Sequence, residues 1–92
     1  MMRKVLQTRT FANSKKKLHK KQIKELDNAI RDILKNPEIG EQKKGDLQGV
    51  YVYKCNITKQ LFLLAYLFDE ESLTLLMVGP HENFYRDLKK PI

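Results

Sequence analysis

Apolar residues recur every three or four positions between residues 23 and 34, the spacing that places side chains on one face of a helix. The stripe consists of Ile23, Leu26, Ile30, Ile33 and Leu34. The positions between them are mostly charged, as expected for a side that faces solvent. Asn36-Pro37 ends the predicted helix, because proline disfavours helical geometry in the residue before it.

The segment before this helix predicts a short strand and a first helix. Residues 3–9 combine β-branched side chains with charged flanks, which is typical of a strand at the edge of a sheet. Thr10 is the expected N-cap of the first helix, since its hydroxyl can accept a hydrogen bond from an unpaired backbone N–H. Phe11 and Leu18 fall at helical spacing, and His19-Lys20 is the expected corner between the two helices.

The periodicity changes after a polar loop that ends near residue 49. Residues 50–57 are β-branched and aromatic, residues 61–68 are apolar at every position, and residues 73–78 form a further apolar run. The turns that separate and end these runs lie at residues 58–60, 69–71 and 79–80. Because residues 61–68 suit burial on both faces, they predict the central strand of a sheet.

A short amphipathic tail over residues 82–90 completes the pattern. The element order is therefore β-α-α-β-β-β followed by a short C-terminal tail helix. This order predicts the α+β class, with two N-terminal helices packed on a small, largely antiparallel four-stranded sheet. At 92 residues, we expect one domain spanning residues 1–92.

Composition excludes several functional classes. The longest apolar run, residues 61–68, is far shorter than the roughly 20 residues of a membrane helix, and no export signal follows Arg3. A single cysteine, Cys55, excludes an internal disulfide and a cysteine-based zinc site, and in an apolar strand it is expected to be a small core residue. The two histidines, His19 and His81, have no carboxylate at ligand spacing. We expect a cytoplasmic protein with no metal, no cofactor and no membrane partner.

The charge is strongly basic and uneven. The net charge is +7, and nine basic residues precede the first acidic residue, Glu25. The lysines of the predicted helices are Lys15, Lys16, Lys17, Lys20 and Lys21. Such a surface binds a polyanion, whether nucleic acid, an anionic membrane face or an acidic protein segment, although a solvated lysine-rich helix has the same composition.

Candidate chemistry gathers near the predicted sheet and tail. His81 follows a strand end, where side chains are commonly presented to ligands, although a histidine there often only caps or bonds locally. Lys54 interrupts an apolar strand, and it either extends its ammonium into solvent or holds a phosphate. Tyr51, Tyr53 and Tyr85 are core candidates that could also stack on unpaired bases.

Three stretches resemble the RelE/ParE superfamily, the small toxins of bacterial type II toxin–antitoxin modules. They are residues 45–54, 61–66 and 79–88, and the last contains Gly79-Pro80-His81 with Tyr85 shortly after, a pattern similar to that of RelE-like members. The resemblance covers nearly the whole chain. It implies two helices packed on a four-stranded sheet, and a cognate antitoxin protein as partner.

The resemblance also implies an activity. RelE-like members cleave messenger RNA in the ribosomal A site without a metal: the ribose 2′-hydroxyl attacks the adjacent phosphate and leaves a cyclic phosphate. By this resemblance Lys54 faces the scissile phosphate, His81 is the general acid and Tyr85 orients the substrate. The side chains expected to bind RNA are those of Lys15, Lys16, Lys17, Lys20, Lys21, Lys43, Lys44 and Arg86. The implied partners are the ribosome and mRNA, with DNA contacted only through the antitoxin complex.

Three positions depart from the family pattern. Leu63 stands where several relatives carry a central-strand arginine, Asn56 where relatives can carry a second lysine, and Tyr51 where relatives favour arginine. In an enzyme, the compensating charges would come from Lys43, Lys44 or Arg86. The missing arginine at Leu63 favours an alternative, a ParE-like inhibitor of DNA gyrase with no catalytic activity of its own, whereas His81 near the tail favours the endoribonuclease. A basic domain that merely binds nucleic acid is a third interpretation.

Overall fold

Strand β4 (Gln60–Phe68) lies at the centre of a five-stranded sheet, as its apolar sequence predicts. The computed structural model describes residues 3–82 and 84–88. The other strands are β1 (Lys4–Gln7), β2 (Glu41–Gln42), β3 (Tyr51–Ile57) and β5 (Ser72–Pro80). Their order is β1-β5-β4-β3-β2, with β1 parallel to β5 and every other pair antiparallel.

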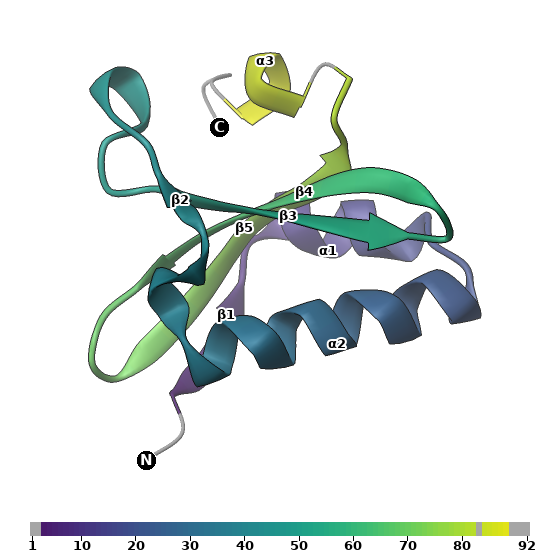
Figure 1. The fold of residues 1–92 in the computed structure, drawn as a ribbon, viewed down its shortest axis with the longest axis horizontal. Helices are drawn as coiled ribbons and strands as arrows, with labels where there is room; N and C mark the ends of the chain where they lie inside the picture. The colour runs from purple at the N-terminus through teal and green to yellow at the C-terminus, as the bar shows by residue number, and fades with distance from the viewer. Residues whose placement is uncertain (1–2, 83, 89–92) are drawn as a thin grey trace.

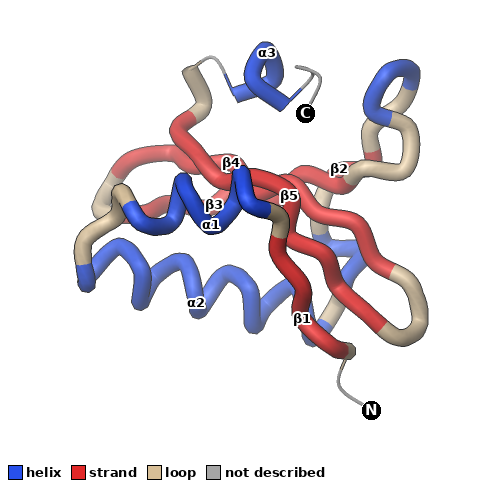
Figure 2. The backbone as a smooth tube through the Cα atoms, turned by 180° about the vertical axis from the view of Figure 1, so that it is seen from behind, coloured by secondary structure: helices blue, strands red, loops and turns tan. Residues whose placement is uncertain are grey.

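Helices cover both faces of this sheet. Helices α1 (Arg9–Lys16) and α2 (Lys20–Lys35) lie on one face, and α3 (Phe84–Leu88) lies on the other (Figures 1 and 2). The predicted α+β class and the two-helix layer are therefore confirmed.

Side-chain alternation along the strands builds a separate core on each face. The larger core packs the helices against the sheet, and its buried members are Phe11, Leu26, Ile33, Ile57, Phe62, Leu64, Tyr66, Leu73, Leu75 and Val78. The smaller core lies under α3 and consists of Val52, Leu63, Ala65, Met77 and Phe84. We call the side of the sheet that carries this smaller core the α3 face.

A β-bulge enlarges the smaller core. Ala65 is opposite Met77 and Tyr66 is opposite Leu75, so Leu76 is an extra residue in β5. The bulge allows two consecutive residues, Leu76 and Met77, to pack into the same cluster on the α3 face, which simple alternation does not permit.

The predicted N-cap of the first helix was wrong. Thr8, not Thr10, caps α1: its Oγ1 accepts the Phe11 N–H at 3.0 Å and donates to the Leu76 carbonyl at 2.7 Å. The hydroxyl therefore caps the helix and also ties its start to β5, whereas Thr10 lies inside the helix. The predicted corner is confirmed, since α2 starts directly after His19, whose N–H donates to Gln22 Oε1 at 3.1 Å.

The prediction of a four-stranded sheet missed one strand, β2. This strand has two residues, and Glu41 and Gln42 pair with Val52 and Tyr51 of β3. A two-residue strand inside a polar loop has no hydrophobic periodicity, so its pairing is decided by the strand beside it. One-turn 3₁₀ helices flank it at Pro37–Ile39 and Gly45–Leu47.

The Tyr66 hydroxyl fixes the connection from α2 to the sheet. It accepts the Gly40 N–H at 3.0 Å and donates to the Pro37 carbonyl at 2.6 Å. Burial raises the pKa of this hydroxyl, which therefore stays protonated and available as a donor. A Cβ atom at Gly40 would lie 2.5 Å from the hydroxyl oxygen, so this close approach requires glycine.

We expect Tyr66→Phe to lower the free energy of unfolding by about 1–3 kcal/mol, because two backbone groups lose their partner. Tyr51→Phe is the matched control, since it removes a hydroxyl from the neighbouring ring, whose centroid is 5.6 Å from that of Tyr66. For the control we expect a loss below about 0.5 kcal/mol. Urea unfolding of both variants makes the comparison, and equal losses would contradict the assigned role.

Candidate functional site

Lys54 projects from β3 on the α3 face. It alternates with Tyr53 and Cys55, which pack against the helix-side core, and it shares its face with Val52. Across the sheet Lys54 is opposite Leu63, and Leu63 is opposite Gly79 of β5. Two interstrand steps of about 4.8 Å each therefore separate the Lys54 backbone from the end of β5. The side chain of Lys54 is exposed at this position.

His81 and Tyr85 lie together beyond the end of β5. The His81 N–H donates to the Leu61 carbonyl at 3.3 Å, which continues the β4–β5 pairing by one residue. The His81 and Tyr85 rings meet edge to face, with centroids 6.5 Å apart and an interplanar angle of 86°. Phe84 is 1% exposed and anchors the start of α3 in the smaller core, and this anchor holds the following Tyr85 beside His81.

Lys43 joins this pair from the loop after β2. Its Nζ lies 5.0 Å from the centroid of the Tyr85 ring and 3.2 Å from Glu41 Oε1. The pKa of Lys43 is raised, mainly by a hydrogen bond to Tyr85. Burial lowers this pKa, and Glu41 raises it further. The side chain is only 20% exposed. Lys43 is thus a fixed cation, and Glu41 is a site residue that sequence reasoning missed.

Two leucines of β4 lie on this face between Lys54 and the end of β5 or beside it. Leu61 is 40% exposed on the α3 face, whereas Leu63 is completely buried in the smaller core. In chemical terms the arrangement offers an imidazole for proton transfer, a phenol for stacking, and ammonium groups for a phosphate. We call His81, Tyr85, Lys43 and Lys54 the α3-face cluster.

The basic corner between α1 and α2 lies elsewhere on the molecule. Its exposed lysines are Lys16, Lys17, Lys20 and Lys21. Lys15 departs from this group, because its Nζ lies 3.9 Å from Asp27 Oδ1, which partly neutralises its charge. Lys44 and Arg86 are exposed in the loop before β3 and in α3.

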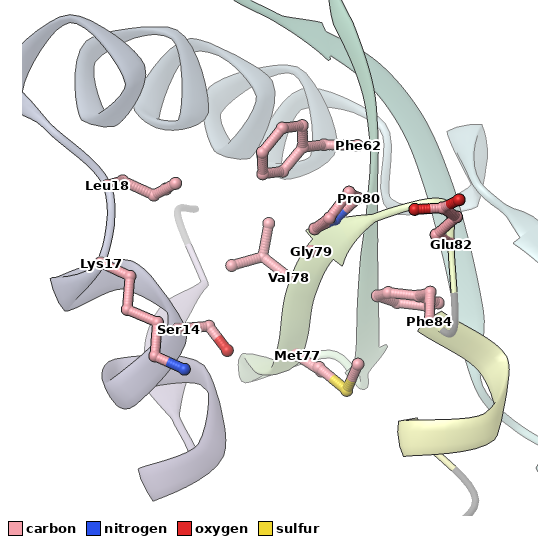
Figure 3. Close-up of a pocket in the computed structure, with 10 residues that line it drawn as sticks. All are labelled: Ser14, Lys17, Leu18, Phe62, Met77, Val78, Gly79, Pro80, Glu82 and Phe84. Carbon is pink, nitrogen blue, oxygen red and sulfur yellow. The ribbon is translucent and has the colours of Figure 1, made fainter.

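A cleft connects this corner with the strand that leads to His81. It has a volume of about 300 Å³, and Figure 3 shows Ser14 of α1 and Lys17, the C-cap of that helix, on one side and Val78, Gly79 and Pro80 of β5 on the other. Glu82 lines its far end. Lys17 is therefore the corner lysine that shares a cleft with the residues flanking His81.

The other candidate side chains lie apart from the cluster. Tyr51 stacks on Tyr66 and Tyr53 packs against the helix-side core, so neither ring reaches the α3 face. Within residues 3–82 and 84–88, no group of three or more His, Cys, Asp or Glu side chains is placed to bind a metal. Among these same residues, no helix combines the length and apolar composition that a membrane crossing requires.

Comparison with known proteins identifies the class. A family model described as "ParE-like toxin of type II bacterial toxin-antitoxin system" matches residues 5–89. The chain therefore belongs to this family of toxins, as the sequence resemblance predicts. A search of curated proteins gave no match.

Solved structures with similar folds come from the same group of toxins. A free double mutant of the E. coli toxin RelE has a TM-score of 0.71 at 20% identity, with 92% of this chain and 90% of that chain covered. The toxin–antitoxin complex RelBE2 from Mycobacterium tuberculosis gives 0.68 at 18%, with coverages of 88% and 100%. The YoeB/ParE toxin from Agrobacterium tumefaciens gives 0.64 at 19%, with coverages of 85% and 98%. At these identities the likeness establishes the fold.

Cys55 is expected to be chemically inert. Burial is the main cause that raises the pKa of its thiol to about 11, and the Glu25 carboxylate adds to it. The thiolate fraction near pH 8 should then be about 100-fold lower than in the unfolded chain, because two pKa units separate the thiols. A disulfide reagent should accordingly label the folded protein at least about 100-fold more slowly than the protein in urea. Equal rates would show that Cys55 is accessible and ionised.

Proposed function

We propose that this toxin is a ribosome-dependent endoribonuclease that cleaves mRNA by attack of a ribose 2′-hydroxyl on the adjacent phosphate. One observation carries the proposal: His81, Tyr85 and Lys43 meet on the α3 face, where Lys54 is also exposed. These side chains offer a proton donor, a stacking ring and cations, which such a cleavage can use without a metal.

In the proposed reaction one phosphorus–oxygen bond forms and one breaks. The 2′-oxygen forms a bond to phosphorus while its proton passes to a solvent water molecule, and the bond from phosphorus to the 5′-oxygen breaks. The products are a 2′,3′-cyclic phosphate and a 5′-hydroxyl. The 5′-oxygen needs a proton, and imidazole is the side-chain type whose ordinary titration range suits this transfer. We assign the transfer to His81, and Tyr85 orients the nucleotide by stacking.

Negative charge grows on the phosphoryl oxygens during this step, and cations stabilise it. Lys54 and Lys43 supply that charge in the proposal. Lys43 is held by Tyr85 and Glu41, so it needs little reorganisation when the substrate binds. It thereby compensates for the arginine that the central strand lacks at Leu63.

A second candidate function is inhibition of DNA gyrase without catalysis. The observation that favours it is Leu63, which is completely buried in the smaller core and leaves the centre of the α3 face without a charge. In that case the α3 face would serve as a protein-binding surface.

We further propose that a cognate antitoxin neutralises the toxin in the cytoplasm. The antitoxin segment that would mask the basic surface of the toxin is a mostly disordered acidic segment that folds on binding. Contact with DNA would then occur only through the antitoxin complex. The solved M. tuberculosis relative is itself a toxin–antitoxin complex, which supports this partner.

His81→Ala should lower the single-turnover cleavage rate on saturating ribosomes by about 10²–10⁴-fold, the usual effect of losing a general acid. Ribosome affinity should hardly change, because the lost interaction belongs to the transition state. Lys54→Ala should also slow cleavage, but without moving the pH profile, since a lysine ordinarily stays charged near neutral pH. The rate is measured by mapping RNA ends in a translation extract.

His19→Ala is the matched control, since His19 lies at the α1–α2 corner, and it should cleave at nearly the wild-type rate. Wild-type cleavage by His81→Ala would refute the catalytic assignment. A gyrase supercoiling assay run alongside separates the two functions: lost supercoiling with intact RNA would establish the inhibitor.

The exposed corner lysines should bind ribosomal RNA phosphates, because lysine is a flexible point charge with little base specificity. Replacing Lys16, Lys17, Lys20 and Lys21 with Gln should weaken ribosome binding and reduce the slope of log affinity against log salt by up to about 3. The pattern of cleavage sites should stay the same. A Lys4→Gln/Lys35→Gln variant, altered at exposed lysines elsewhere, should keep nearly the full slope. Equal slopes for both variants would show that the corner is only a solvated face.

A further inference from the structure

A second cleft lies in the loop between β2 and β3, beside the α3-face cluster. It has a volume of about 440 Å³, within the range of small-molecule sites, and is lined by Gln42, Lys43, Lys44, Gly45 and Gln48. Lys43 is shared between this cleft and the cluster, because its ammonium contacts Tyr85. A molecule bound in the cleft would therefore be a direct neighbour of one bound at His81 and Tyr85.

Backbone hydrogen bonds hold the walls of this cleft. The Lys43 N–H donates to the Val50 carbonyl at 2.8 Å, and Gln42 is paired with Tyr51 in the sheet. Within the loop, the Gln48 N–H donates to the Gly45 carbonyl at 3.0 Å. Gly45 has a φ of +69°, a conformation that glycine adopts without strain and that this turn requires. The loop thus has a defined shape before any ligand binds.

The lining combines two kinds of chemistry. Lys43 and Lys44 are cations that suit a phosphate group. Gln42 and Gln48 each carry an amide with two N–H donors and one oxygen acceptor. A phosphate alone has no use for the acceptor. The edge of a nucleobase presents donors and acceptors together, and amide side chains read such edges. A nucleotide offers a partner to each of these four side chains.

Because the proposed function is that of an endoribonuclease, and resting on that proposal, we infer that this cleft is a nucleotide subsite that sets the base preference of cleavage. Gln42 and Gln48 contact the base next to the scissile phosphate, and Lys44 contacts its flanking phosphate. Lys43 links this nucleotide to the one stacked on Tyr85. The substrate class is single-stranded RNA, since paired bases do not expose these edges.

The first test compares the base preference at each position around the cut, read by sequencing RNA ends from a translation extract. Gln42→Ala/Gln48→Ala should reduce the preference at one fixed position by at least about 10-fold, since a single amide–base contact contributes discrimination of this order. Gln7→Ala is the control, because Gln7 lies in β1 at the opposite edge of the sheet, and it should keep the wild-type preference. An unchanged preference in the double variant overturns the subsite while leaving the proposed function intact.

The second test does not depend on cleavage. The ¹⁵N-labelled full chain is titrated with trinucleotides that carry 2′-O-methyl groups and cannot be cut. The side-chain amide signals of Gln42 and Gln48, assigned from the single variants, should shift, and that of Gln7 should not. Absence of these shifts at millimolar trinucleotide overturns the subsite. If the wild-type protein cuts no RNA, the proposed function fails by itself, and this titration decides whether the cleft binds a nucleotide.

Discussion

The burial of β4 on both faces is the constraint on which the rest of the structure depends. Every side chain from Phe62 to Tyr66 is buried, so the sheet needs a cover on each side. Helices α1 and α2 cover one face, and among the described residues α3 covers the other (Figure 1). A helix of five residues is not stable alone, so its position follows from the burial of Phe84. Filling such a site with a phenylalanine side chain contributes on the order of 3–5 kcal/mol.

This packing decides the character of the candidate site. With α3 docked on the sheet, the position of Leu63 becomes part of a dry core. An arginine there would bring an uncompensated charge under α3, at a cost of several kcal/mol. The apolar residue at position 63 and the close packing of α3 are therefore two aspects of the same feature. The positive charge lies instead at the rim, on Lys43 and Lys54.

Lys43 and the exposed lysines of the helix corner differ in physical kind. Lys43 is mostly covered and has two partners, Tyr85 and Glu41, so its ammonium has a defined position. Lys16 and Lys20 at the helix corner are exposed, and flexible charges of this kind attract a polyanion without selecting its geometry. The same amino acid thus presents a positioned charge at one place and a flexible charge at another, and the difference lies in burial and partners.

The sequence by itself determined the elements with strong periodicity: α2, the central strand β4, the turn at residues 69–71 and the corner at His19. It also indicated the family and placed His81 and Tyr85 in one short segment, so their proximity needed little more than a turn. Hydrophobic spacing is local information, and these features are locally encoded.

Only the tertiary structure decided the rest. The capping of α1 by Thr8 depends on a carbonyl of β5, and β2 exists because β3 lies beside it. The meeting of Lys43 with Tyr85 joins residues far apart in the chain, and the docking of α3 settles it. The spacing of residue types along the chain does not predict such contacts, because their energy comes from groups that become neighbours only when the sheet assembles.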